Sequence, residues 1–370
     1  MAGIYVHIPF CASRCIYCGF YSTTGNKNMQ DEYIDCLLQE YEMRKEYLKG
    51  ETIDTIYIGG GTPSILSESN IIKLANGIRN GHTLKEFTVE CNPDDISSTL
   101  AQTLKQVGVN RVSMGVQTFS DERLVFLHRR HRSADIPRAI ATLREAGIEN
   151  ISIDLMFGFP GETLDEWRMD LHKATALDVT HISAYSLMYE EGTMLSRMLE
   201  EGKIEETGEE CSADMYDALL EEMQLAGFEH YEISNFAKPG FRSQHNSNYW
   251  NGTYYLGVGA AAHSYDGLSR QWNVDDINIY IKGVKCGCLK AEREELDEVT
   301  RYNDLITTSL RTREGIDLST LNDTFRDYIM KSAQNGMKAG NIVIENNRLH
   351  LSRKGLYVSD EVLSELIFIK

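Results

Sequence analysis

The sequence predicts an α/β fold in which six parallel strands alternate with helices to form a partial (β/α)6 barrel, followed by a small C-terminal α+β domain. Short runs rich in β-branched residues alternate with longer stretches of helical periodicity through the first half of the chain. Crossovers of consistent hand between parallel strands curl such a sheet into a barrel or part of one. The alternation loosens near residue 230, which predicts a different arrangement beyond it.

The barrel elements follow one another in a regular order. The predicted strands are residues 5–8, 55–58, 87–90, 111–115, 151–155 and 181–186. The predicted helices between them are residues 30–48, 68–79, 97–106, 135–146 and 163–177. In barrels of this kind the chemistry lies on the loops after the C-terminal ends of the strands. Polar and glycine residues follow those ends and are expected to share one face: Cys11, Cys15, Cys18, Gly59, Gly60, Gly61, Glu90, Asn92, Gln117, Asp154 and Tyr185.

The remainder of the chain is predicted to extend the sheet and then to form a separate unit. A helix at 217–225 precedes a region at 231–280 that is rich in Gly, Asn and aromatic residues. The C-terminal part is expected to contain helices at 300–313, 320–335 and 355–366 and a hairpin at 342–351 that turns at Asn346 and Asn347. The predicted domains are therefore 1–230 for the barrel core, 231–290 for the sheet extension and 291–370 for the C-terminal α+β domain.

Composition restricts the partners. The formal net charge of −18 argues against a nucleic-acid surface, because phosphate binding requires clustered Lys and Arg. No apolar run approaches the roughly 20 residues of a membrane-spanning helix, and the first ten residues lack the basic leader of a signal peptide. We therefore expect a cytoplasmic protein with no nucleic-acid partner and no integral membrane segment. In that reducing compartment the eight cysteines are expected to be buried side chains and metal ligands rather than disulfides.

Three cysteines stand directly after the first predicted strand, in Cys11-Ala-Ser-Arg-Cys15-Ile-Tyr-Cys18. Thiolates suit iron–sulfur clusters, and three of them leave one iron of a four-iron, four-sulfur cluster without a protein ligand. That open iron can chelate the amino and carboxylate groups of a small molecule. The alternative is a zinc site with a distant fourth ligand. The spacing, on one loop after the first barrel strand, favours the cluster.

This spacing and the strand before it resemble the radical S-adenosylmethionine (SAM) superfamily. Gly59-Gly60-Gly61-Thr62-Pro63, after the second predicted strand, is similar to the glycine motif of that superfamily, whose backbone receives the amino group of SAM. Glycine permits that close approach because it lacks a side chain. The resemblance implies a [4Fe-4S] cluster held by the three cysteines, with SAM as a second cofactor.

A closer resemblance, from residue 5 through the C-terminal part, is to the coproporphyrinogen dehydrogenase family and its haem-chaperone branch. The chemistry of two matched residues agrees with this likeness, because Asp154 can accept hydrogen bonds from ribose hydroxyls and Arg129 can face the carboxylate of SAM. Matched residue by residue, the resemblance implies SAM contacts from Tyr5, Tyr17, Gly60, Gly61, Thr62, Glu90, Gln117, Arg129 and Asp154.

Two departures distinguish this chain from the oxidases of that family. The oxidase pattern has a fourth cysteine two positions after the third, where this chain has Phe20. The oxidases also have an N-terminal extension before the cluster, whereas Cys11 is already the first cluster cysteine here. Both features resemble the haem-chaperone branch, and both weigh against porphyrinogen decarboxylation.

The haem-chaperone branch also carries the pattern His-Asn-x-x-Tyr-Trp, which stands here at residues 245–250. A histidine can ligate haem iron, and neighbouring aromatic side chains can pack on the macrocycle. The resemblance therefore implies His245 as a haem ligand. The alternative is an aromatic loop packed on the barrel, with His245 bonded to a buried carbonyl group.

The resemblance implies a haem chaperone that binds haem and transfers it to an acceptor protein, with the [4Fe-4S] cluster and SAM as cofactors. The alternative is an oxygen-independent coproporphyrinogen III oxidase-type radical SAM enzyme. A third class is a metal-binding scaffold that keeps the cluster without SAM chemistry. Whether the chain is an enzyme is left open by these residues.

Overall fold

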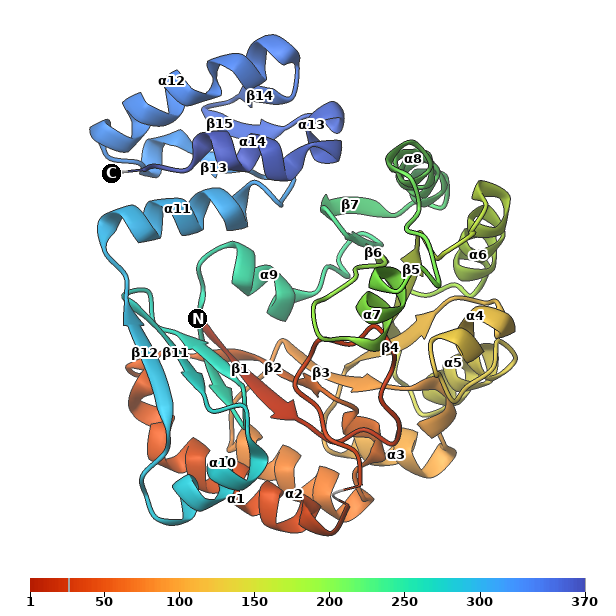
Figure 1. The fold of residues 1–370 in the computed structure, drawn as a ribbon. Coiled ribbons are helices and arrows are strands. Elements are labelled where there is room, and N and C mark those ends of the chain that lie inside the picture. Colours follow the sequence, from red (N-terminus) through yellow and green to blue (C-terminus); the bar gives the residue numbers. More distant parts are fainter. Residues whose placement is uncertain (26, 370) are drawn as a thin grey trace.

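The computed structural model describes residues 1–25 and 27–369, and its dominant feature is a curved sheet whose central strands run parallel (Figure 1). Within the described residues the sheet has 12 strands, in the order β12-β11-β10-β9-β1-β2-β3-β4-β5-β6-β8-β7. Neighbouring strands from β1 to β6 pair in parallel. These six are β1 (Ala2–Ile8), β2 (Ile53–Gly60), β3 (Glu86–Cys91), β4 (Arg111–Gln117), β5 (Asn150–Phe157) and β6 (His181–Ser186). The predicted partial parallel barrel is therefore confirmed.

The longer helices that connect these strands, such as α2, α3, α5 and α6, cover the outer face of the sheet, and α7 and α8 follow β6 (Figure 1). Their starts follow capping rules: Ser67 and Ser97 accept hydrogen bonds from backbone N–H groups of the first turns, and Thr163 forms a capping box with Glu166. The short α4 and α7 were not predicted, because a helix of six or seven residues gives too few repeats for a periodic signal. The helices are α1 (Gln30–Arg44), α2 (Glu68–Arg79), α3 (Ser98–Gln106), α4 (Asp121–Phe126), α5 (Asp135–Glu145), α6 (Leu164–Ala176), α7 (Met194–Glu200) and α8 (Glu209–Leu225).

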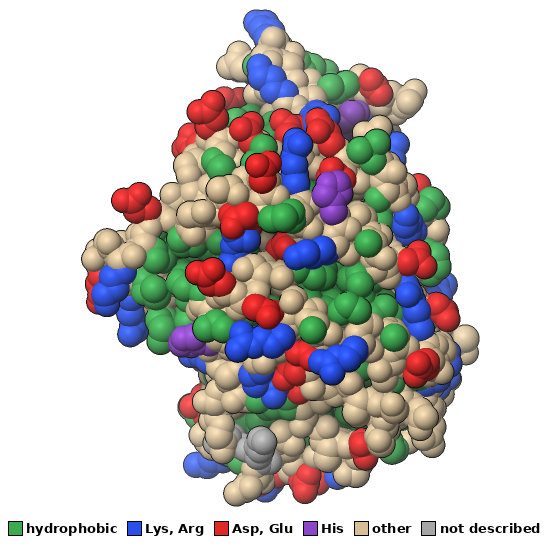
Figure 2. All heavy atoms as spheres, turned by 90° about the vertical axis from the view of Figure 1, so that its right-hand side faces the viewer, with side chains coloured by type: hydrophobic (Ala, Val, Ile, Leu, Met, Phe, Trp, Pro, Cys, Tyr) green, Lys and Arg blue, Asp and Glu red, His purple; other side chains and the backbone are tan. Residues whose placement is uncertain are grey.

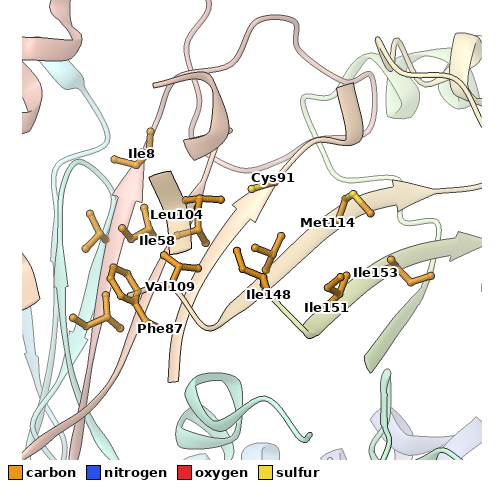
Figure 3. Packing of buried hydrophobic residues seen from close by; sticks show 14 of the residues in the cluster. Ile8, Ile58, Phe87, Cys91, Leu104, Val109, Met114, Ile148, Ile151 and Ile153 are labelled. Atoms are coloured by element: carbon orange, nitrogen blue, oxygen red, sulfur yellow. The ribbon is translucent and has the colours of Figure 1, made fainter. Parts of the chain in front are cut away.

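The core lies between the sheet and these helices. In Figure 3 Leu104 of α3 lies beside Ile58 and Val109, and Ile153 belongs to the same hydrophobic cluster further along the sheet. Full burial of one such side chain contributes about 1.5–3 kcal/mol to folding. The outer side of the helices is polar: on the face in Figure 2, basic and acidic side chains are interspersed, and no broad area of described side chains is purely basic.

Residues 229–295 extend the sheet at both edges. β9 (Tyr254–Val258) pairs in parallel with β1, and β10 (His263–Tyr265), β11 (Ser269–Asn273) and β12 (Ala291–Glu295) continue antiparallel. At the opposite edge β8 (Asn235–Ala237) and β7 (Glu229–Glu232) pair antiparallel beyond β6. Because β12 ends at residue 295, the large sheet continues past the predicted boundary at 290. The three-domain division itself stays a prediction. Two helices lie in this region, α9 (Gln244–Trp250) and α10 (Ile277–Lys285).

The C-terminal part has its own hydrophobic cluster, which includes Tyr302, Phe325 and Ile329, and lies above the barrel in Figure 1. The predicted hairpin is present, and Asn346 and Asn347 both have positive φ, as a two-residue hairpin turn requires. The elements are α11 (Glu298–Ser309), β13 (Ile316–Asp317), α12 (Asp323–Ala339), β14 (Ile342–Glu345), β15 (Arg348–Leu351), α13 (Arg353–Tyr357) and α14 (Ser359–Leu366). Short 3-10 turns are η1 (Lys27–Met29), η2 (Lys45–Leu48), η3 (Pro63–Ile65), η4 (Pro93–Asp95) and η5 (Leu318–Thr320).

Candidate cluster and cofactor site

A cavity of about 630 Å³ opens at the C-terminal ends of the parallel strands. Residues from the loops after β1, β2, β3, β4, β5 and β6 line it together, as expected for a barrel of parallel strands. All three predicted cluster cysteines and eight of the nine predicted SAM residues are among the lining residues: Cys11, Cys15, Cys18, Tyr17, Gly60, Gly61, Thr62, Glu90, Gln117, Arg129 and Asp154.

The three cysteines are half-buried on the loop that follows β1. The backbone N–H of Cys18 donates to the carbonyl of Cys15 over 3.3 Å, so the loop turns back on itself. The hydroxyl of Thr62 donates to the sulfur of Cys11, and the guanidinium of Arg129 donates to the sulfur of Cys15, each over 3.6 Å. These donors stabilise negative charge on sulfur, which suits thiolate ligands.

The electrostatics of the loop fit a bound cluster. Burial raises the pKa of Cys11 and of Cys18, and the nearby thiol of Cys15 raises both pKa values further. Two or three thiolates side by side are therefore unfavourable unless cationic metal ions neutralise them. Among the described residues, no three His, Cys, Asp or Glu side chains meet closely enough to hold a single metal ion. A cluster needs no such meeting point, because each of its thiolate ligands binds a different iron.

The glycine segment after β2 is fixed against the start of the cysteine loop. The N–H of Gly61 donates to the carbonyl of Ile8 over 2.7 Å, and the N–H of Thr62 donates to the carbonyl of Phe10 over 2.8 Å. Gly60 has φ +109, and a Cβ on it would lie 2.5 Å from the imidazole of His7. Only glycine fits this backbone, so the exposed peptide groups at the cavity depend on it.

We expect Gly60→Ala to weaken SAM binding at least about tenfold, or 1.4 kcal/mol, because the new methyl group displaces His7 and the cavity backbone. Equilibrium dialysis of anaerobically reconstituted protein measures this affinity. Gly240→Ala is the matched control, since Gly240 has φ +86 but open space around its Cα. Equal SAM affinity of the two variants would contradict the prediction.

Glu90 lies in the barrel interior at the end of β3. Its carboxylate accepts hydrogen bonds from the hydroxyl of Tyr57 over 2.7 Å and from the N–H of Gly60 over 3.1 Å. Burial raises the pKa of Glu90 to about 7, despite these two hydrogen bonds. The carboxyl group is therefore close to half ionised at neutral pH and can receive an ammonium group that enters the cavity.

Arg129, Gln117 and Asp154 line the same cavity as Glu90. The Arg129 guanidinium donates to the side-chain oxygen of Asn92 and to the carbonyl of Gly115, both over 2.6 Å. Gln117 ends β4 with φ +68, a left-handed conformation that turns the chain into the loop. The hydroxyl of Ser113 donates to Asp154 over 3.4 Å, and burial raises the pKa of Asp154. Cationic, amide and acidic groups thus face one space.

Two predicted site residues are not among the cavity-lining residues. The hydroxyl of Tyr5 lies 2.9 Å from Nδ1 of His7. His245, at the start of α9, is 1% exposed. Its Nδ1 lies 2.9 Å from the hydroxyl of Thr55, and its Nε2 lies 3.0 Å from the hydroxyl of Tyr249. Both ring nitrogens of His245 are therefore engaged, and an iron ion can reach either one only if α9 moves.

Arg111 lies in the barrel interior, which was not predicted from the sequence. It begins β4, is almost fully buried, and its Nε and Nη1 have no hydrogen-bond partner among the described residues. Its positive charge lowers the pKa of Glu90 and of Asp154, which burial raises. An arginine at the start of a predicted strand normally faces solvent, so only the closure of the barrel places this charge below the cavity.

Comparisons with known proteins agree with this geometry. Residues 5–174 match the radical SAM superfamily, which implies a [4Fe-4S] cluster and SAM as cofactors. Over 380 aligned residues, the chain is 35% identical to the protein named Heme chaperone HemW of Bacillus subtilis (strain 168), with 99% of each chain covered. The chain belongs to the HemW family of radical SAM proteins. Heme chaperone HemW of Lactococcus lactis is 32% identical, with 98% of this chain and 96% of that protein covered.

A solved structure shares the fold of this HemW family member. Coproporphyrinogen III oxidase (HemN) of Escherichia coli, described as a radical SAM enzyme, superposes with a TM-score of 0.85. The match covers 99% of this chain and 90% of that one at 22% identity. At this identity the likeness shows the fold alone, and it confirms the predicted α/β class.

Proposed function

We propose that this protein is a haem chaperone that binds haem and transfers it to an acceptor protein, while carrying a [4Fe-4S] cluster and SAM. The main support is the 35% identity, across 99% of both chains, to a protein named as a haem chaperone. The cavity gives a second, physical support, because it gathers three thiols, a glycine backbone and complementary charges at one end of the barrel.

In this proposal Cys11, Cys15 and Cys18 hold the cluster, and the other predicted residues orient SAM. Held there, the two cofactors would supply one-electron chemistry, in which a reduced cluster would be the electron donor to the sulfonium of SAM. Glu90 receives the ammonium group, Arg129 faces the carboxylate, and Asp154 accepts from the ribose hydroxyls. Gly60 and Gly61 contribute backbone groups at close range.

Glu90 makes SAM binding depend on pH. Its pKa of about 7 means that the carboxyl group is ionised above that pH and protonated below it. We therefore expect the Kd for SAM to rise by up to about tenfold per pH unit as the pH falls below 7. Equilibrium dialysis between pH 6 and 8 measures this trend. Glu90→Gln is expected to bind SAM more weakly and with a flat profile, whereas a flat profile in the parent protein would refute the role.

Phe20 bears on the choice between carrier and oxidase. It stands where the oxidase pattern has a fourth cysteine, lines the cavity, and is 72% exposed. An apolar side chain there adds contact area for a flat ligand rather than another metal ligand. This observation supports haem binding over porphyrinogen decarboxylation.

A haem titration of the anaerobically reconstituted protein tests the proposal. We expect uptake of haem to saturate at one equivalent per chain, and we expect apo forms of haem proteins to remove that haem. In parallel, coproporphyrinogen is supplied with SAM and a reductant. Repeated turnover to a divinyl product would overturn the carrier proposal in favour of the oxidase, and absence of haem uptake would overturn it as well.

The partners in this proposal are haem and an acceptor protein in a reducing, cytoplasmic compartment. In the part of the chain that the structure describes, no helix is both long enough and apolar enough to cross a membrane. The formal net charge of −18 disfavours nucleic acids as partners.

A further inference from the structure

We infer that haem lies across the mouth of the cluster cavity, with His128 as an axial ligand to its iron and Arg14 facing a propionate. This inference rests on the proposed function and names the site where that function takes place. The residues that carry it line the same cavity as the cysteines: His128, Arg14, Phe20, Tyr185 and Met188. None of them was predicted from the sequence to contact haem.

His128 has the availability that an iron ligand needs. It is exposed at the cavity, and neither of its ring nitrogens has a hydrogen-bond partner among the described residues. A neutral imidazole with free nitrogens is a common axial ligand of haem iron. His245, in contrast, is 1% exposed and has both nitrogens engaged. His128 therefore reaches a ligand in the cavity without any rearrangement of the fold.

The backbone holds His128 in place at some cost. Its φ of +61 is left-handed, a conformation that residues other than glycine adopt only where the surrounding contacts hold it. Three contacts fix this conformation: the carbonyl of His128 accepts from the hydroxyl of Ser13 over 3.5 Å, the carbonyl of Leu127 accepts from the N–H of Ile16, and the N–H of Arg129 donates to Leu124. The loop of His128 is thus tied directly to the cysteine loop.

Apolar side chains supply a surface for the macrocycle. Phe20 is 72% exposed, Met188 is 61% exposed and Tyr185 is 38% exposed, and all three line the cavity. Large apolar side chains are rarely left in water together at a cavity unless they contact a ligand. Because two of the three are aromatic, they offer flat faces or edges to a flat, apolar ring system.

The charge of Arg14 at the mouth of the cavity favours a ligand that is both apolar and acidic. Arg14 is exposed on the cysteine loop and forms no ion pair among the described residues, whereas Arg130, which also lines the cavity, pairs with Asp94 and Asp95. Because the net charge of −18 disfavours the approach of a carboxylate, a carboxylate ligand needs a local cation to bind. The unpaired guanidinium of Arg14 matches a propionate of haem. The apolar side chains match the macrocycle, and the imidazole of His128 matches the iron ion.

The test is haem titration of the reconstituted parent protein, His128→Gly and His172→Ala, followed by absorption spectroscopy. Glycine suits φ +61, so His128→Gly keeps the loop conformation. We expect this variant to bind haem at least tenfold more weakly and with a shifted Soret band. His172→Ala, which removes an exposed histidine from α6, is expected to match the parent protein. An unchanged spectrum and affinity in His128→Gly would overturn the inference while the carrier function stands.

Arg14→Gln tests the propionate contact separately. We expect the parent protein to prefer haem over haem dimethyl ester, which lacks free carboxylates, and Arg14→Gln to lose most of that preference. An equal preference in both proteins would overturn the role of Arg14. If the parent protein binds no haem at all, the proposed function fails together with this inference, and the parent titration alone identifies that outcome.

Discussion

Cys15→Ala is expected to abolish the [4Fe-4S] cluster. After anaerobic reconstitution, iron and acid-labile sulfide should fall from about four of each per chain to nearly none, because two thiolates do not hold a four-iron cluster that already lacks a fourth protein ligand. SAM binding should be lost with the cluster, since the open iron is one of its anchoring points. Iron and sulfide analysis, together with the charge-transfer absorption of the cluster, measures the effect.

The control for this prediction is another cysteine of similar exposure. Cys211 is half-buried on α8 and is not among the cavity-lining residues, so Cys211→Ala should keep the full content of iron and sulfide. A cluster retained in full by Cys15→Ala would contradict the ligand assignment. Stoichiometric zinc in the parent protein, with no labile sulfide, would instead favour the zinc alternative.

The strands of the barrel were predictable because β-branched runs mark buried parallel strands. The strand at 181–186 agrees with β6, whereas β1 and β2 begin earlier than predicted. Ala2 and Ile53 are paired residues, and their pairing is a property of the sheet rather than of either segment. Strand ends depend on the neighbouring strand, so local propensity alone does not locate them.

The cluster-binding part of the cavity could be predicted from the sequence because a single motif contains all three cysteines. These cysteines are close in sequence. The residues that follow the other strands were expected near them because the C-terminal ends of parallel barrel strands lie on one face. His128 and Arg111 were missed because their roles depend on exposure and burial. A histidine next to basic residues and an arginine at the start of a strand give no periodic or spacing signal. Only the folded structure shows that His128 is exposed and that Arg111 is buried.

For His245 the situation is reversed: its motif could be recognised in the sequence, but the burial of the side chain could not be predicted. The resemblance implies a haem ligand, whereas the alternative expected from the sequence was a packed loop with a satisfied histidine. In the structure the imidazole stacks on Tyr57, with ring centroids 5.2 Å apart, and the nitrogens face Thr55 and Tyr249. Haem ligation by His245 stays a prediction, and it requires these contacts to break.

His245→Ala is expected to destabilise the protein by about 3 kcal/mol, because it leaves a cavity and two hydroxyl groups that lose a buried partner. The side chain also fills the space above Gly3, where a Cβ would lie 3.1 Å from the imidazole. In addition, Glu86 accepts from the N–H groups of Gln244 and His245, which fixes the start of α9 over the barrel. Urea unfolding measures the loss, and His172→Ala should stay within about 0.5 kcal/mol of the parent protein.

The same contacts predict how stability changes with pH. Burial lowers the pKa of His245 to about 3, compared with about 6.5 for an unfolded histidine. Between these values the unfolded chain binds a proton that the native protein does not, so the contribution of His245 to stability falls as the pH drops below about 6.5. His245→Ala should therefore lose less stability than the parent protein between pH 6.5 and 5. Two outcomes would mean that the imidazole does not hold α9 against the barrel. One is an equal loss of stability with falling pH in both proteins, and the other is an alanine variant as stable as the parent protein.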